Sequence, residues 1–171
     1  IRSCLVGSEM CIRDSFTPES NPAIYNHIEY LAREVKKVDT FHPVMTVTAE
    51  IGKRQVEALN RYCPSIDIHG INSYGGVTSL SQRYRKAGGE KPFIVTEYGQ
   101  PGTWEMKKNP WGMYDEPSST KKGMYYKNAY ESVDSDPLCL GSFAFTWGAK
   151  QEASATWFGM LLPSGEKLEC V

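Results

Sequence analysis

Four short apolar runs alternate with segments of helical character, and this alternation constrains the fold more than any other feature of the sequence. Each run is apolar along its whole length rather than at alternate residues, a pattern typical of parallel strands covered on both faces. The sequence therefore predicts an α/β protein with a parallel sheet. The runs span Val44–Thr48, Ile66–Asn72, Pro92–Glu97 and Leu140–Trp147.

The segments between the runs carry helix signals. Asn21 followed by Pro22 predicts the start of a first helix that ends near Val38. Its apolar face is predicted to contain Ile24, Ile28, Leu31, Val35 and Val38. Further helices are predicted over Lys53–Tyr62, Leu80–Ala87 and Lys121 to about Ser135, with a long loop over Tyr98–Pro117 and a closing hairpin over Thr156–Leu162. This order fits a doubly wound sheet or half of a (β/α)8 barrel, but the glycine-rich turn of a doubly wound nucleotide-binding fold is absent.

Composition and charge bear on the class of partner. With 171 residues, of which 40% are hydrophobic, the chain is long enough to bury one sizeable core. A formal net charge of -1 provides no basic field for nucleic acid or an anionic membrane, and no apolar run approaches the roughly 20 residues of a membrane helix. A neutral partner such as a carbohydrate is compatible with this charge, and we expect no nucleic acid and no membrane partner. The five cysteines form no CxxC pair, so free thiols are expected, with no metal and no cofactor.

Residues 1–15 do not fit this pattern. They have no periodicity, cap or turn signal, and they join abruptly to the helix signal at Asn21. The stretch Glu9–Asp14 resembles the in-frame translation of a transposon adapter used in sequencing libraries; an ordinary N-terminal strand or loop is the alternative. We expect residues 1–15 to be unstructured and the natural chain to have been cut before Phe16, so the predicted domain is 16–171.

Polar and aromatic residues stand where the apolar runs end. Active sites of (β/α)8 barrels lie at the carboxyl ends of the strands, so these residues are candidates for function. A carboxylate that ends an apolar strand is costly to desolvate without a role or a partner, which makes Glu97 the strongest candidate. An ion pair or a helix cap is the alternative for this glutamate. The strand-end residues are Glu50, Asn72 with Tyr74, Glu97 with Tyr98, and Trp147.

Several of these segments resemble one enzyme family in the correct order. Lys91–Gly99, with its Thr-Glu-Tyr-Gly motif, resembles the seventh barrel strand of clan A glycoside hydrolases, closest to the catalytic domain of glycoside hydrolase family 2. Ile71–Tyr74 resembles the end of the sixth strand, where a tyrosine hydrogen-bonds the nucleophile. Phe145–Gly148 resembles the end of the eighth, where a tryptophan forms the floor of the sugar subsite. The segment Ile24–Pro43 resembles the one after the fourth strand.

The resemblance implies a fold, an activity and a site. The fold is the C-terminal half of a (β/α)8 TIM barrel, roughly helix 4 through strand 8. The activity is hydrolysis of O-glycosidic bonds in a β-linked oligo- or polysaccharide by a retaining double displacement, in which one carboxylate attacks the anomeric carbon and another acts as acid and base. The implied catalytic residues are Glu97, as the nucleophile, and Tyr74. The implied substrate-binding residues are Asn72, Tyr98, Trp104, Trp147 and Gln151.

The sequence departs from the family in two places. The acid/base of the family is the glutamate of an Asn-Glu pair that ends the fourth strand, and this chain has no such pair. Glu19 lies near the expected place without the strand or the asparagine. We therefore expect the acid/base to be missing, and the 171-residue chain, as half a barrel, to be inactive and poorly soluble.

The second departure follows Trp147. The run Gly148–Met160 is not the usual family 2 continuation, which indicates a different branch of the clan, one acting on β-glucans, with Gln151, Glu152 or Trp157 shaping the subsites. A β-glucan transglycosylase, a non-catalytic carbohydrate-binding relative and an unrelated α/β protein remain open as alternatives.

Overall fold

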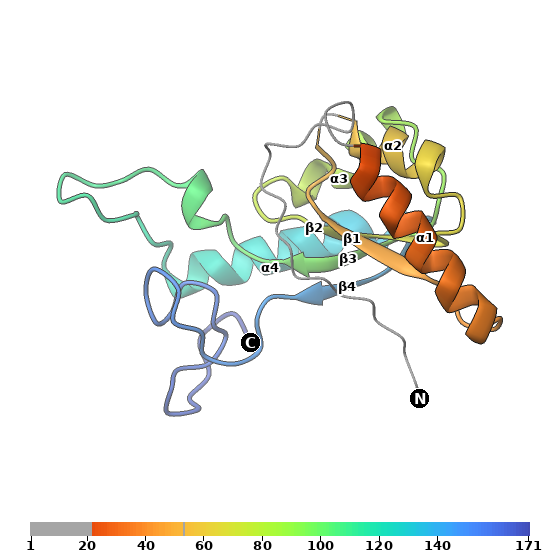
Figure 1. The fold of residues 1–171 in the computed structure, drawn as a ribbon. Helices are drawn as coiled ribbons and strands as arrows, with labels where there is room; N and C mark the ends of the chain where they lie inside the picture. Colours follow the sequence, from red (N-terminus) through yellow and green to blue (C-terminus); the bar gives the residue numbers. More distant parts are fainter. Residues whose placement is uncertain (1–21, 53) are drawn as a thin grey trace.

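The computed structural model describes residues 22–52 and 54–171, which form a parallel sheet with helices in the connections (Figure 1). The strands are β1 (Met45–Ala49), β2 (Ile68–Asn72), β3 (Phe93–Tyr98) and β4 (Cys139–Ala144). The helices are α1 (Pro22–Val38), α2 (Gln55–Tyr62), α3 (Leu80–Lys86) and α4 (Ser119–Asp134), with single 3-10 turns η1 (Val77–Ser79) and η2 (Thr103–Glu105). The predicted α/β class is confirmed, while Glu19 and residues 1–15 lie outside the described part of the chain.

The strands lie side by side in the order in which they occur along the chain. The sheet has the order β1-β2-β3-β4, and all three neighbouring pairs are parallel. Crossovers between parallel strands are almost always right-handed, so a chain that steps in one direction places its helices on one face of the sheet. A doubly wound sheet would reverse direction instead. The topology is therefore consistent with part of a barrel.

Most element boundaries agree with the predictions to within two residues, and β4 is the exception. It ends at Ala144 rather than Trp147 because the following segment leaves the sheet. Thr146 donates its amide to the carbonyl of Phe158 at 3.0 Å, and Met160 donates its amide to the carbonyl of Thr146 at 3.1 Å. Residues 145–147 are therefore held by the C-terminal segment instead of continuing the strand.

Strand β4 also differs from the predicted coverage on both faces. Leu140 and Phe143 are 57% and 62% exposed, so neither is covered by another layer of the described structure, in which β4 is an edge strand.

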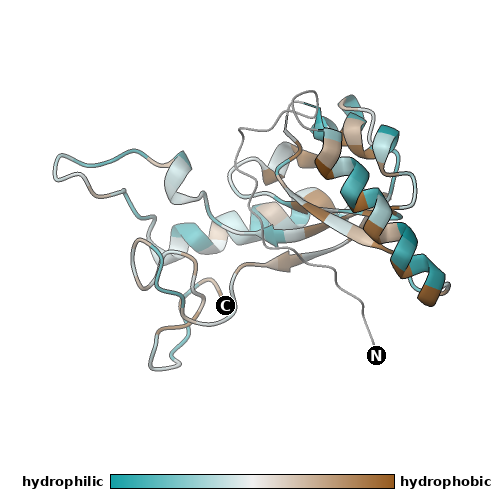
Figure 2. Ribbon diagram, viewed as in Figure 1, coloured by the Kyte–Doolittle hydropathy of each residue, from teal (hydrophilic) through white to brown (hydrophobic). Residues whose placement is uncertain are grey.

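Helix α1 differs from the prediction in the face that it buries. Ile28 and Val35 pack against the core as predicted, but Leu31 is 38% and Val38 91% exposed. The buried residues of α1 are Tyr25 and Ala32, which pack with residues of α2, and Figure 2 shows the mixture of polar and apolar residues on this helix.

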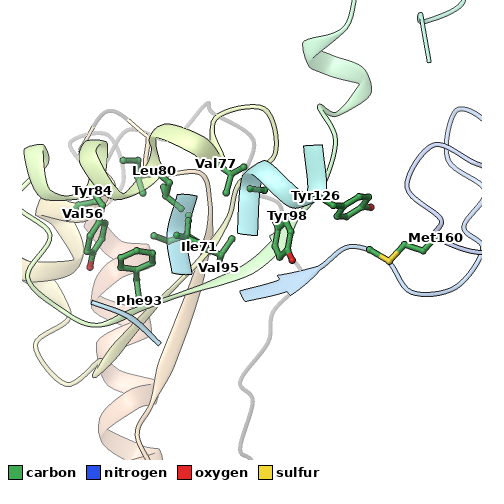
Figure 3. Packing of buried hydrophobic residues seen from close by; sticks show 13 residues of the cluster. Val56, Ile71, Val77, Leu80, Tyr84, Phe93, Val95, Tyr98, Tyr126 and Met160 are labelled. Carbon is green, nitrogen blue, oxygen red and sulfur yellow. The ribbon is translucent and has the colours of Figure 1, made fainter. Parts of the chain in front are cut away.

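The main hydrophobic core lies between the sheet and helices α3 and α4 (Figure 3). Tyr84 of α3 belongs to this core, with its ring centroid 5.0 Å from that of Phe93. A second cluster joins α1 to α2 around Leu59 and Cys63. Cys63, Cys139 and Cys170 are free thiols, as expected for them from the sequence. Among the described helices, none has the length and apolar character needed to cross a membrane.

His69 is a core histidine in β2, with 2% of its surface exposed. Its Nε2 lies 2.8 Å from the hydroxyl of Thr48, and its ring packs against Tyr84 at 5.7 Å. Burial, and secondarily the nearby charge of Lys91, lowers the pKa of His69 to about 3. The imidazole is therefore neutral in the folded chain at all but strongly acidic pH.

This burial predicts an acid-sensitive stability. An unfolded histidine takes up a proton near pH 6.5, whereas folded His69 does so only near 3, so the free energy of unfolding falls as pH drops through this window. Between pH 6.5 and 5 the loss should be about 1.5 kcal/mol, and urea midpoints measured across that range will show it. His69→Gln should remove this part of the pH dependence, whereas His42→Gln, at an exposed site, should not. Equal slopes for wild type and His69→Gln would contradict the assignment.

Candidate active site

The candidate site lies where the carboxyl ends of β2, β3 and β4 meet. Glu97, half-buried near the end of β3, is in register with Asn72, the last residue of β2. Its carbonyl accepts the amide of Ser73 at 2.9 Å, and the carbonyl of Tyr98 accepts the amide of Phe145 at 2.8 Å. These backbone bonds hold the three strand ends at one level, so that side chains from three segments converge.

An irregularity in β3 decides which residues face the site. Phe93, Val95 and Tyr98 all belong to the main core, so the usual alternation slips by one residue after Val95 (Figure 3). The pairing of β3 shifts register at the same place against both neighbouring strands. As a result Thr96 and Glu97 both stand outside the core, where the Thr96 hydroxyl donates to Oδ1 of Asn72 at 2.6 Å.

The same irregularity places Tyr98 in the main core. The sequence resemblance implies a substrate contact for this residue, but Tyr98 is 8% exposed and its ring lies 6.0 Å from that of Tyr126 in α4. Burial raises the pKa of its phenol. Tyr98 thus packs between the sheet and α4, which is the opposite side of the strand from the candidate site.

Tyr74 is the hydrogen-bonding partner of Glu97. Its hydroxyl donates to Oε2 of Glu97 at 2.6 Å, and the two side chains come from the segments that end β2 and β3. Burial, followed by the hydrogen bond and the charge of Glu97, raises the pKa of Tyr74 far above its usual value. The phenol therefore remains a hydrogen-bond donor to the Glu97 side chain.

Three aromatic rings surround Tyr74. The ring centroids of Phe158, Trp104 and Phe145 lie 5.3, 5.5 and 6.2 Å from that of Tyr74. Trp104 is 53% exposed, so part of its indole is open to solvent beside the Glu97–Tyr74 pair. An exposed indole beside a carboxylate can stack on the apolar face of a sugar ring. We call Trp104, Phe145 and Phe158 the ring cluster.

Trp104 is among the substrate-binding residues predicted from the sequence, whereas Phe145 and Phe158 are not. Phe145 directly follows Ala144, the last residue of β4. A predicted strand ending at Ala144 would have made Phe145, rather than Trp147, the aromatic residue at the strand end. Trp147 itself is 64% exposed, and Gln151 is exposed as well. The structure gives Phe158 its place through the backbone bond to Thr146, a contact for which the sequence holds no local signal.

The segment after Trp147 divides into interior and site-facing residues. Trp157 is 1% exposed and its indole donates to the carbonyl of Pro101 at 3.2 Å, so its ring has no open face for a sugar. Glu152 lies 3.1 Å from Lys150, whose ammonium stands 4.4 Å from the centroid of the Phe145 ring. The charge of Glu152 also contributes to the raised pKa of Tyr74, which places this carboxylate within electrostatic reach of the site.

Glu50 shows what a structural carboxylate at a strand end looks like. Arg83 donates to one of its oxygens at 2.8 Å, and the hydroxyl of Ser73 donates to the other. Its backbone has a φ of 59°, a conformation uncommon for residues other than glycine, and its amide donates to the carbonyl of Asn72 at 2.8 Å. Glu50 is thus held in an ion pair, whereas Glu97 accepts a hydrogen bond from the phenol of Tyr74.

Within residues 22–52 and 54–171, no group of three or more histidine, cysteine, aspartate or glutamate side chains is arranged to hold a metal ion. The chemistry available to the described site is that of a carboxylate, a phenol and a partly open aromatic surface.

Comparison with known proteins gives matches at the level of the fold. No protein-family model and no curated protein matches the sequence. Two solved structures that match are uronidases. One is a β-galacturonidase from Eisenbergiella tayi bound to galacturonate, with a TM-score of 0.60 and 14% identity over 86% of this chain and 29% of that chain. The other is a β-glucuronidase from Bacteroides uniformis, with a TM-score of 0.61 and 15% identity over 90% of this chain and 20% of that chain. The first is described as a GH2 enzyme.

A third match comes from another glycoside hydrolase family. It is a GH128 exo-β-1,3-glucanase from Aureobasidium namibiae (TM-score 0.59, 13% identity, 91% of this chain and 60% of that one). This chain therefore spans less than two thirds of the length of each of the three structures. Its fold is similar to that of glycoside hydrolases.

Proposed function

We propose that this chain is part of the catalytic domain of a retaining β-glycosidase, in which Glu97 is the nucleophile. The observation that carries the proposal is the 2.6 Å hydrogen bond from Tyr74 to Glu97 at the carboxyl end of a buried parallel strand. The partly exposed Trp104 beside this pair and the similarity of the fold to glycoside hydrolases support it. The half-barrel architecture is part of the same proposal.

In the proposed reaction the carboxylate of Glu97 attacks the anomeric carbon. The bond from that carbon to the leaving oxygen breaks, and the leaving oxygen takes a proton from a second carboxyl group. Water, deprotonated by that second group, then hydrolyses the glycosyl ester and releases Glu97. Tyr74 holds Oε2 of Glu97 and so leaves Oε1 as the attacking atom. We place the second carboxyl group outside residues 22–171.

Two classes of sugar are candidates for the substrate. Uronides are suggested by the galacturonidase and the glucuronidase, and β-glucans by the exo-β-1,3-glucanase, to which this chain is similar over 60% of that enzyme's length. A panel of aryl glycosides of both classes will separate them. A transglycosylase would form the same glycosyl ester but transfer its glycosyl group to an acceptor sugar. Product analysis with added oligosaccharide will reveal this transfer.

Covalent trapping tests the proposal. The protein that carries this chain is incubated with 2-deoxy-2-fluoro glycosides bearing activated leaving groups, which need no general acid to form a stable glycosyl ester. Trypsin should release residues 87–107 as one peptide, because proline follows Lys91, and fragment spectra should place the sugar on Glu97 rather than on Glu90 or Glu105.

A Glu105→Gln variant is the matched control and should label normally, whereas Glu97→Gln should not label. Labelling of a different carboxylate would overturn the assignment of the nucleophile. Sugar binding without any labelling or turnover would favour the non-catalytic carbohydrate-binding relative.

A further inference from the structure

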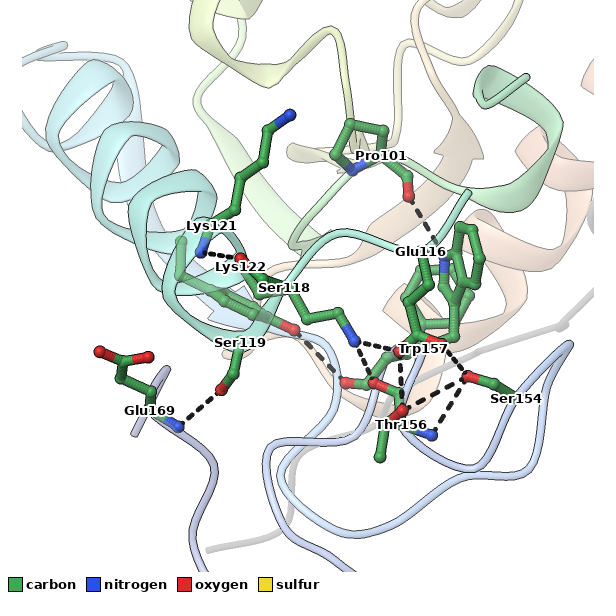
Figure 4. Close-up of polar contacts among 12 residues, drawn as sticks. Pro101, Glu116, Ser118, Ser119, Lys121, Lys122, Ser154, Thr156, Trp157 and Glu169 are labelled. Atoms are coloured by element: carbon green, nitrogen blue, oxygen red, sulfur yellow. Dashed lines mark hydrogen bonds and ion pairs between the residues drawn. The ribbon is translucent and has the colours of Figure 1, made fainter. Parts of the chain in front are cut away.

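Helix α4 carries a lysine whose ammonium is buried. Lys122 is 3% exposed, and its Nζ forms an ion pair with the Glu116 carboxylate and donates to the carbonyl of Thr156 at 2.6 Å (Figure 4). A buried charge is tolerated only when it is paired and hydrogen-bonded, and removing one partner leaves the other uncompensated. The two partners of Lys122 come from separate loops, one after β3 and one after β4.

Glu116 extends this contact into a network. Its Oε2 accepts the hydroxyl of Ser154 at 2.6 Å, and its Oε1 accepts the hydroxyl of Thr156 at 2.7 Å. Burial would raise the pKa of Glu116, but the hydrogen bonds from Lys122, Ser154 and Thr156 outweigh it and lower the pKa below its usual value. We call these four residues the Lys122 network.

The segment that the network holds leads directly to the candidate site. Trp157 follows Thr156 and binds the carbonyl of Pro101, in the loop after β3, at 3.2 Å. Phe158 comes next, and its ring packs against both Tyr74 and Trp104 at 5.3 and 6.2 Å. Three consecutive residues therefore join the buried ammonium to the tyrosine that binds Glu97.

Neither of these loops has extensive regular structure to fix its position. Residues 99–118 contain only η2 and a short hairpin bridge between Lys108 and Tyr114, and residues 145–171 contain isolated bridges. Segments without helix or sheet depend on side-chain contacts for their order. The Lys122 network is such a contact, and it is anchored to a long helix that packs on the sheet.

We propose that Lys122 is a positioning residue for the candidate site. By holding Thr156 and Glu116 it fixes Phe158 and Trp104 around Tyr74, and thereby sets the direction of the Tyr74 hydroxyl toward Glu97. Lys122 itself does not touch the substrate. The catalytic part of this inference rests on the proposed function, whereas the structural part does not.

The test uses Lys122→Met, which keeps the length of the side chain and removes its charge, in the protein that carries this chain. Lys127→Met, on the exposed surface of the same helix, is the matched control. Hydrogen exchange of the Thr146 and Met160 amides should become at least about tenfold faster in Lys122→Met, while the amides of β2 and β3 remain protected. The control should show neither change.

Two further readouts separate positioning from simple loss of stability. The amide of Val77 donates to the carbonyl of Tyr74, so its exchange reports on Tyr74 directly and should also become faster. In turnover at a temperature well below unfolding, kcat should fall at least about tenfold with KM changed less than threefold, because a misplaced Tyr74 affects the reacting carboxylate. Lys122→Arg should recover part of kcat.

Unchanged exchange of the Thr146 and Met160 amides in Lys122→Met would overturn the proposal. Faster exchange of these two amides, with the exchange of Val77 and kcat both unchanged, would overturn it as well. If Lys122→Met does not fold, the double variant Lys122→Met with Glu116→Gln leaves no unpaired buried charge and takes its place. Absence of turnover in the wild type would count against the proposed function alone, because the exchange at Val77 still decides whether the network positions Tyr74.

Discussion

Replacing Glu97 with alanine is expected to lower kcat/KM of the protein that carries this chain at least about 10⁴-fold. In the proposed mechanism Glu97 is the nucleophile, and a retaining enzyme without its nucleophile has no comparable alternative to the covalent route. The measurement uses an aryl glycoside with a good leaving group, so that bond cleavage does not depend on the second carboxyl group. Folding is checked by the urea midpoint of the same variant.

Added azide makes this result specific for the nucleophile. The cavity left by Glu97→Ala admits azide, which attacks the anomeric carbon from the side that the carboxylate occupied and yields a glycosyl azide of inverted configuration. Tyr74→Phe should show a smaller loss, about 10- to 100-fold, because the carboxylate remains and only its hydrogen bond is removed. More than a tenth of wild-type activity in Glu97→Ala, or a rescue product of retained configuration, would rule out the assigned role.

Replacing Tyr84 with alanine is expected to have the largest effect on stability, about 3–5 kcal/mol. The side chain is 1% exposed, and its ring packs against Phe93 and His69 while its hydroxyl donates to the carbonyl of Lys91 at 3.1 Å. A Cβ added at Gly89 would collide with the Tyr84 ring, so the ring fills its space up to the backbone. Loss of the ring therefore leaves a cavity bounded by sheet, helix and turn.

Urea unfolding of Tyr84→Ala and Tyr84→Phe gives the comparison. The phenylalanine variant keeps the ring and loses one hydrogen bond, for which the expected cost is about 1 kcal/mol. A similar cost for the two variants would show that the surrounding core relaxes into the cavity, contrary to this expectation.

The sequence predicts the elements of this fold well because their signals are local. Pro22 marks the beginning of α1, and Ser118 caps α4 by accepting a hydrogen bond from the Lys121 amide. The apolar runs likewise mark the strands, because a strand buried in a parallel sheet needs apolar residues throughout its length. The pairing of Tyr74 with Glu97 follows from the family resemblance and agrees with the geometry of the described site.

Features that depend on contacts between distant segments could not be predicted from the sequence. In the sequence Lys122 is an ordinary polar residue of a helix, and only its contacts with Glu116 and Thr156 explain why it is buried. Trp157 is one of three residues that the sequence predicts to shape the subsites, but its indole donates a hydrogen bond to the carbonyl of Pro101 and lies in the interior. Phe158 reaches the site because its backbone pairs with Thr146, which in turn ends β4 early.

The slipped alternation in β3 has a consequence for engineering this strand. Val95 and Tyr98 face the core and Glu97 faces the opposite side, and the pairing of β3 with both neighbouring strands accommodates one extra residue between Val95 and Tyr98. Deletion of Thr96 would therefore leave Val95 and Tyr98 on one face and Glu97 on the other in regular alternation, and would remove the hydrogen bond from the Thr96 hydroxyl to Asn72. The tolerant place for added residues begins beyond Gly102, where the chain has left the sheet and Trp111 stands 85% exposed in the loop.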